Sequence, residues 1–298
     1  MRPSLFLALL LLPLAATAEP AFRFRDASAQ RRAEAVQAFA RQPAGWERVR
    51  LATEAFLGTR YVVSPLGEGE GIDRDPRVRW DGVDCLTFVE TALALGNADG
   101  VDAARRALDD IRYASGAAPS FESRLHLMIA QWIPAQIRRG YLEDVTADFA
   151  PTIPAEVHYD EARWKTRRGA LRALPWNEKL AGTHAIRMIP IEQARAIAGT
   201  LPEGLVINVV REPRADRLNR VTHTGFVVVH DGKRFVRHAS FNRGEVLDEP
   251  IERFLARHAQ MRRWVVSGIH LLAVRDNSAR VRALVDDADA APAVIAAP

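Results

Sequence analysis

The sequence predicts an α+β fold in which helices come first and a mostly antiparallel sheet follows. Before about residue 140, apolar residues recur at helical spacing between charged residues. From Leu205 to Val274, runs of β-branched and aromatic residues alternate with turn signals, a pattern typical of strands. Asp231-Gly232 joins two of these runs and predicts a tight hairpin. Segregation of helices and strands along the chain favours the α+β class.

Length and composition set limits on stability and on partners. A chain of 298 residues is long enough for one large core, and its single cysteine excludes a disulfide within the chain. The formal net charge is +4, of which Arg2 contributes one unit. This small excess does not indicate a nucleic-acid partner.

Residues 1–18 have the features of a secretory signal peptide. Arg2 precedes an apolar run from Leu5 to Leu14, and residues 16–18 (Ala-Thr-Ala) form a small-x-small cleavage site. The apolar run is too short to span a bilayer, and no cysteine lies near the site to carry a lipid. We therefore expect a periplasmic or secreted protein without stable membrane insertion, acting as a monomer.

The first half of the chain carries most of the expected helices. Besides one that begins at Cys85, helices are expected at Ser28–Gln42, Trp46–Phe56, Val101–Tyr113 and Ser120–Gly140, the last disturbed by Pro134. Glycines and a proline make Ser64–Gly71 a loop, which lacks the lysine and the Ser/Thr of a phosphate-binding P-loop. Tyr141–Pro190 is charged and broken by prolines, so we interpret about 100–190 as a helical insertion with an irregular end.

Strands dominate the second half. A short helix at Ile191–Ala198 is expected to precede strands at Leu205–Val210, Val221–Val229, Arg234–His238 and Trp264–Val274. The Ala/Pro/Asp composition from Asp286 onward predicts disorder. We expect a signal peptide over 1–18, one domain over 19–278 and a disordered tail over 279–298.

Cys85 lies at the expected start of a buried helix. Phe88, Val89 and Ala92 follow it at helical spacing, and Asp84 is a good N-cap residue. A helix N-terminus favours an anion, and the thiolate is the reactive form of cysteine. A buried structural cysteine is the alternative, but an unpaired cysteine in an exported protein suggests a reactive thiol.

The predicted hairpin brings two histidines together. With Asp231-Gly232 as a two-residue turn, His223 faces Ser240 and Gly225 faces His238. The histidines then share one face of the sheet as diagonal neighbours, and Gly225 leaves space for an imidazole.

One cysteine at a helix N-terminus and two histidines on a sheet face are the layout of a thiol hydrolase. We assign Cys85 as nucleophile, His223 as base and His238 as the group that orients the base. Zinc bound by these three side chains is the competing interpretation, but neither HExxH nor CxxC spacing is present. We expect no metal and no cofactor.

Four motifs, taken in order, resemble the NlpC-type cell-wall cysteine hydrolases, which have a papain-like fold. They are Gly58-Thr59-Arg60-Tyr61, Asp84-Cys85-Leu86-Thr87-Phe88, His223-Thr224-Gly225 and His238-Ala239-Ser240. Leu86-Thr87 departs from the Ser-Gly of common members. The departures resemble the N-acetylmuramoyl-L-alanine amidase-like branch, with its Ser-Pro-Leu-Gly-Glu-Gly loop, Asp-Cys-x-Thr-Phe-Val-Glu, Ser-Arg-Leu-His and His-Ala-Ser motifs. The likeness spans about Thr53 to Val274.

This resemblance implies a papain-like core and cleavage of the bond between N-acetylmuramic acid and L-alanine, with peptidoglycan or muropeptide fragments as the partner. It also makes Tyr61, Asp84 and Ser240 candidates for substrate binding, and Arg124 is our own candidate for a stem-peptide carboxylate. Three alternatives stay open: γ-D-glutamyl endopeptidase activity, acyl transfer by the same triad, and a non-catalytic wall-binding protein.

Overall fold

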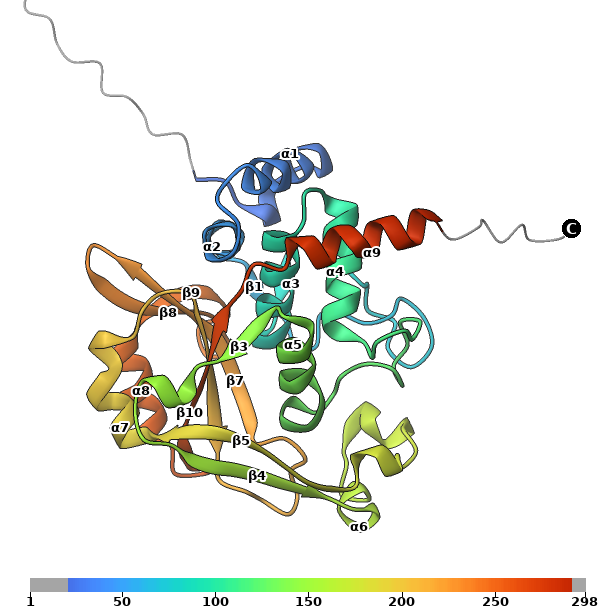
Figure 1. The fold of residues 1–298 in the computed structure, drawn as a ribbon. Helices are drawn as coiled ribbons and strands as arrows, with labels where there is room; N and C mark the ends of the chain where they lie inside the picture. Colours follow the sequence, from blue (N-terminus) through green and yellow to red (C-terminus); the bar gives the residue numbers. More distant parts are fainter. Residues whose placement is uncertain (1–20, 291–298) are drawn as a thin grey trace, which may run out of the picture.

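Helices precede the main sheet in the computed structural model, which describes residues 21–290 (Figure 1). Four of them lie close to their predicted bounds. They are α1 (Ala29–Ala40), α2 (Trp46–Ala55), α3 (Cys85–Asn97) and α4 (Val101–Arg112). The expected α+β class is therefore confirmed.

A mostly antiparallel sheet has the strand order β2-β1-β9-β8-β7-β6-β10-β5-β4, and β3 pairs with β10. Only the contact between β1 and β2 is parallel among the described strands. The strands are β1 (Arg60–Tyr61), β2 (Gly82–Val83), β3 (Leu142–Asp144), β4 (Ile153–Tyr159), β5 (Gly182–Pro190), β6 (Leu205–Arg211), β7 (Val221–His230), β8 (Lys233–Ser240), β9 (Glu245–Pro250) and β10 (Val266–Val274).

Both faces of the central strands are buried, each against a different set of helices. Phe226 and Val228 of β7 pack into the larger core with α3, whereas Val227 packs into a second core with α8 (Ile251–Ala259). The short helix α7 (Ile191–Ile197) also lies on the α8 side. Burial on both faces explains why Phe226–Val229 of β7 is a continuous apolar run rather than an alternating one.

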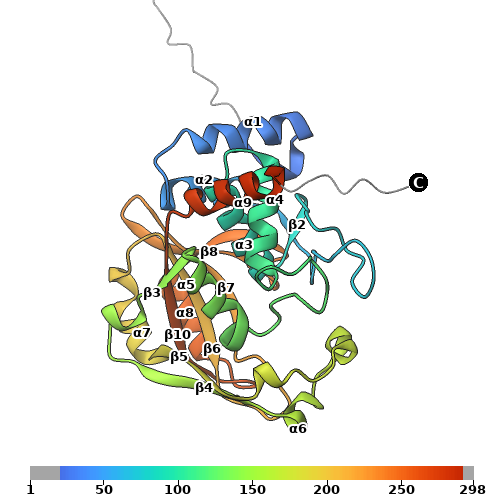
Figure 2. The same cartoon turned by 45° about the vertical axis from the view of Figure 1, so that its right-hand side comes forward.

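The expectation of an irregular insertion over Tyr141–Pro190 is wrong. This segment contributes β3, β4 and β5, and β4 pairs with β5 along its whole length at the edge of the sheet (Figure 2). Helix α6 (Glu161–Trp164) belongs to the segment of chain that connects β4 to β5. In β4 the buried residues Ala155, Val157 and Tyr159 alternate with exposed polar residues, as a strand at a sheet edge requires. The neighbouring prolines and charges made this short pattern hard to recognise in the sequence.

The single helix expected over Ser120–Gly140 is also wrong. A turn and an extended stretch precede a π-helical segment (Met128–Trp132), which runs into α5 (Ile133–Arg139). Pro134 lies in the first turn of α5, directly after the π-helical segment, so the disturbance predicted at Pro134 coincides with the change of helix type.

Disorder predicted from residue 279 is contradicted as far as residue 290. Ser278–Ala290 forms α9, which packs on α4, and Arg280 donates from Nε and Nη2 to the Asp110 carboxylate at 2.8 and 2.9 Å. The predicted signal peptide over 1–18 and the last eight residues of the tail lie outside the described residues. Within residues 21–290, no helix combines the length and apolarity that a membrane crossing requires.

Candidate active site

Cys85 is the first residue of α3, and a capping box fixes the chain there. The Asp84 carboxylate accepts the Thr87 N–H at 2.8 Å, and the Thr87 hydroxyl accepts the Asp84 N–H at 2.9 Å. These two bonds satisfy donors that the helix leaves unpaired, and they set the direction in which the chain enters α3. Asp84, expected to bind substrate, is thus occupied as the cap next to the thiol.

The Cys85 sulfur meets β7 one residue beyond His223. The backbone N–H groups of Thr224, Leu86 and Cys85 itself act on the sulfur and lower its pKa. Burial and the Asp84 charge outweigh them and raise the pKa of Cys85 to about 12. The thiolate favoured by the helix dipole is therefore not the resting form, and the resting site holds a neutral thiol.

The histidine hairpin has the predicted register. Asp231 and Gly232 both have positive φ, at 49° and 73°, as a two-residue hairpin turn of type I′ requires. His230 pairs with Lys233 and Phe226 with Arg237, so paired residue numbers sum to 463 as expected.

Gly225 makes room for His238, as its position in the hairpin predicts. A Cβ at Gly225 would lie 2.8 Å from the His238 Cβ and 2.7 Å from the Arg237 carbonyl oxygen. Real Cβ atoms do not approach other atoms so closely, so no side chain fits at Gly225 with His238 in place.

His223 and His238 meet as predicted, and a carboxylate extends the pair. His223 Nε2 lies 2.8 Å from His238 Nδ1, and His238 Nε2 lies 3.2 Å from Glu249 Oε2. Arg257 holds Glu249 from the other side, with Nη2 donating to Oε2 at 2.8 Å and Nε donating to Oε1 at 3.2 Å. A row of four side chains thus leads away from the thiol.

This row assigns the tautomers of both imidazoles. Burial raises the pKa of Glu249, but hydrogen bonds from His238 and Arg257 outweigh it and hold the pKa at about 2. An ionised carboxylate only accepts, so His238 carries its proton on Nε2 and its Nδ1 accepts the His223 Nε2–H. His223 Nδ1 then keeps its lone pair and is the basic atom.

The second core holds the histidine pair. The His223 ring stacks on His258 with centroids 6.0 Å apart, and Phe254 lies 5.9 Å from His223 and 5.3 Å from His238. Burial, followed by the nearby His238 and His258, lowers the pKa of His223 well below its usual range. His223 therefore rests neutral. Within residues 21–290, no hydrogen bond joins its ring to the Cys85 sulfur.

Tyr61 lies in β1, close to the nucleophile candidate. Burial raises the pKa of its phenol, and the neighbouring Cys85 and Asp84 raise it further. The Tyr61 ring meets Phe241 edge-on at 5.4 Å, and the Phe241 side chain is exposed. Tyr61 thus stays a neutral hydrogen-bond donor beside the thiol.

Arg124 has a different setting from the one expected. Its Nη2 lies 2.6 Å from Glu68 Oε1 and 3.0 Å from Asp73 Oδ2, so two carboxylates of the Ser64–Pro76 loop hold it. This pairing anchors the loop, and Arg124 lies outside any helix. Ser240 ends β8 and accepts the Arg243 N–H at 3.4 Å through its hydroxyl.

Glu249, Arg257 and His258 surround the histidine pair, and none of them was predicted from the sequence. His258 stacks on His223. Glu249 could have been found only by predicting β9 as a strand that pairs with β8. The residues of β9 do not alternate between apolar and polar, so the sequence does not predict this strand. In the described part of the chain, no three His, Cys, Asp or Glu side chains are grouped to hold a metal ion.

Comparison with known proteins gives one family. The AmiA-like family model, described as N-acetylmuramoyl-L-alanine amidase-like, matches residues 51–261. No match was found among curated proteins.

Solved structures share the fold. A Legionella pneumophila protein is 21% identical with a TM-score of 0.71, covering 83% of this chain and 95% of its own. An N-acetylmuramoyl-L-alanine amidase from Bacteroides uniformis is 26% identical with a TM-score of 0.60, covering 76% and 98%. A Bacteroides fragilis protein proposed to be a xylanase is 24% identical with a TM-score of 0.59, covering 75% and 99%.

Proposed function

Because this chain belongs to the N-acetylmuramoyl-L-alanine amidase-like family, we propose that it is a peptidoglycan amidase with a cysteine nucleophile. Its reaction is cleavage of the amide between N-acetylmuramic acid and L-alanine in muropeptides. The observation that carries the cysteine mechanism is the placement of Cys85 against β7 next to His223, whose free Nδ1 is set by His238 and Glu249. We further propose a papain-like, NlpC-type core.

In the proposed mechanism, the Cys85 thiol and the His223 imidazole are both neutral before the reaction begins. The Cys85 thiol gives its proton to His223 Nδ1 as the sulfur attacks the lactyl carbonyl carbon, because neither group is charged beforehand. The imidazolium is stabilised through His238 by the Glu249 carboxylate. The developing oxyanion is bound by the Cys85 N–H at the start of α3 and by the Tyr61 hydroxyl.

Collapse of the tetrahedral intermediate breaks the carbon–nitrogen bond. The amine of L-alanine takes the proton from His223 and leaves with the intact peptide, while the lactyl group stays on sulfur as a thioester. Water, deprotonated by His223, then attacks the thioester and releases the sugar acid. Every bond broken and proton moved in these two steps is accounted for without a cofactor.

The cell wall as substrate agrees with the proposed export of the chain by residues 1–18 and with one catalytic domain over 19–278. A γ-D-glutamyl endopeptidase is the second candidate activity, since the same nucleophile and base serve either amide. A wall-binding protein without activity is the third.

Mass spectrometry of muropeptide digests tests the proposal. Wild type is expected to release free N-acetylmuramic acid-containing sugar and intact stem peptide, and Cys85→Ala and His223→Ala are expected to release neither. His158→Ala, at an exposed histidine in β4, is the matched control and should behave as wild type.

Hydrolysis by Cys85→Ala would overturn the mechanism. Cleavage within the stem peptide would assign the endopeptidase, and sedimentation with sacculi without soluble products would assign the wall-binding protein.

A further inference from the structure

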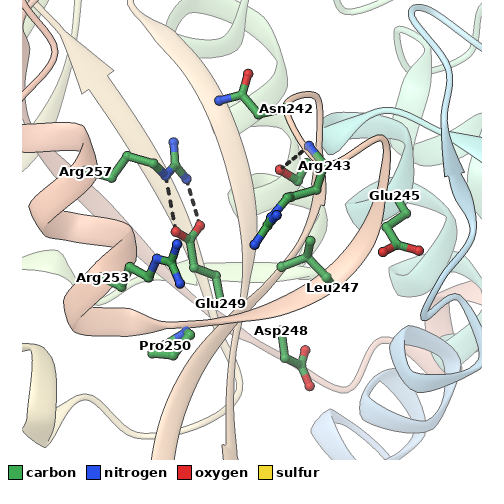
Figure 3. A pocket seen from close by; sticks show the side chains of 10 residues that line it. Asn242, Arg243, Glu245, Leu247, Asp248, Glu249, Pro250, Arg253 and Arg257 are labelled. Atoms are coloured by element: carbon green, nitrogen blue, oxygen red, sulfur yellow. Dashed lines mark hydrogen bonds and ion pairs between the residues drawn. The ribbon is translucent and has the colours of Figure 1, made fainter.

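A cavity of about 440 Å³ opens beside the proposed active site. Its walls are the β8–β9 turn, strand β9 and one side of α8 (Figure 3). The volume lies within the range of small-molecule sites, which is about 300–1,000 Å³. Nothing in the proposed mechanism uses this space.

The cavity continues the sheet face that bears the histidine pair. Ser240 lines it and lies two residues beyond His238 in β8, so both side chains point to the same face. On β9, Leu247 is the partner of His238 and also lines the cavity. Glu249 lines it too, while its Oε2 lies 3.2 Å from His238 Nε2. His238 itself is buried, so a ligand does not lie on the histidine pair. The exposed route from the thiol runs past Phe241, which contacts Tyr61 beside Cys85 and lies between the cavity-lining residues Ser240 and Asn242.

Most charges in the cavity are already paired. Glu249 is bound by Arg257 and His238, and Asp248 is bound by Arg237, with Nε to Oδ1 at 2.8 Å, and by His230 at 2.9 Å. These carboxylates are therefore not available to neutralise further cations.

Arg243, Arg253 and Glu245 are the exceptions, and Figure 3 shows the Glu245 carboxylate pointing away from the two arginines. Figure 3 shows Arg243 reaching from the β8–β9 turn and Arg253 from α8 toward the same space. Within the described residues, neither guanidinium has a hydrogen-bond or ion-pair partner. An isolated exposed arginine is usually a solvated charge, but two from separate elements that converge over one cavity form a site for an anion. Guanidinium groups bind carboxylates through paired N–H donors.

We propose that this cavity is a subsite for a carboxylate of the muropeptide stem, bound by Arg243 and Arg253. The inference rests on the proposed function, because it extends the same substrate from Cys85 past Tyr61 and Phe241 to the cavity. It gives the protein a preference for stems with free carboxylates over stems whose carboxylates are carboxamides. A neutral carboxamide lacks the charge that two guanidinium groups select.

Calorimetry with Cys85→Ala protein tests the subsite apart from catalysis. The probes are N-acetylmuramyl-L-alanyl-γ-D-glutamyl-diaminopimelate and the same compound with its carboxylates amidated. We expect tighter binding of the free acid, and a loss of about tenfold or more on adding Arg243→Gln and Arg253→Gln, since each lost contact is a charge-assisted hydrogen bond. Binding of the amidated probe should not change. Arg31→Gln, at an exposed arginine of α1, is the matched control.

The outcomes separate this subsite from the proposed function. Equal binding of the free acid with and without the two substitutions, or no binding of the free acid, overturns the subsite even if wild type hydrolyses muropeptides. Selective binding that depends on the two arginines supports the subsite even if wild type hydrolyses nothing, in which case the function alone fails. Melting temperatures of the variants check that the fold is intact.

Discussion

The His223 Nε2 atom lies 2.8 Å from the His238 Nδ1 atom, and this contact decides which nitrogen of His223 is basic. His238 can accept there only if its proton sits on Nε2, where Glu249 accepts it at 3.2 Å. Through His238, the proposed base His223 is therefore connected to the Glu249 carboxylate. This connection makes Glu249 a positioning residue, which acts on the proposed base through His238.

Replacing Glu249 should lower kcat rather than raise KM. In Glu249→Ala the His238 tautomer is no longer held, and we expect a loss of about 10²-fold, the size of a general-base contribution. Glu249→Gln keeps an acceptor for His238 and should retain more activity. Steady-state kinetics on muropeptide measure both. Equal loss in the two variants, or a change in KM alone, would contradict the positioning role.

Adding one methyl group at Gly225 should disable the site. The new Cβ would lie 2.8 Å from the His238 Cβ, so His238 must move away from His223. Displacements of this size in a catalytic group cost about 10²-fold in rate. Gly100→Ala is the control, since a Cβ there meets nothing within 4 Å. Wild-type activity in Gly225→Ala would show that the histidine contact is not needed.

Asp84→Asn should make the Cys85 thiol more acidic. The Asp84 charge contributes to the pKa of about 12, and asparagine removes that charge while remaining a good N-cap. The pH profile of iodoacetamide alkylation should therefore shift to lower pH, with little change in melting temperature. Asp84→Ala removes the cap as well and should cost about 1 kcal/mol of stability. An unchanged alkylation profile in Asp84→Asn would argue against the charge effect.

Acid should destabilise the protein through its buried neutral histidines. Burial lowers the pKa of His126 and of His258 to about 4, and it lowers that of His223 well below its usual range. A depressed folded-state pKa means that the unfolded chain takes up protons below about pH 6.5, so stability is present above that pH and is lost toward pH 4.

Urea unfolding at a series of pH values measures this loss. His258→Gln should flatten the fall between pH 6.5 and 4, because one histidine with this shift contributes on the order of 3 kcal/mol. His158→Gln, at an exposed position, should leave the slope unchanged. A fall of equal steepness in His258→Gln would mean that other groups cause the acid sensitivity.

Local chemistry in the sequence determined the order of helices before strands, the capped start of α3 and the register of the histidine hairpin. Each depends on residues close together in the chain: the Asp84–Thr87 box, and the positive φ values that Asp231 and Gly232 adopt. For the same reason the contact between His223 and His238 could be predicted, because a hairpin register is a local property.

Only the tertiary structure decided what surrounds that pair. Glu249 reaches His238 through β9, which lacks an alternating pattern. Arg257 reaches Glu249 from α8, which is amphipathic in sequence, but that pattern does not show what the helix packs against. Arg124 is paired by a loop more than 50 residues away. The protonation state of the Cys85 thiol also depends on the tertiary structure. The helix dipole favours its thiolate, but burial and the Asp84 charge raise the pKa to about 12. Burial depends on how distant segments pack, and a local sequence pattern does not contain that information.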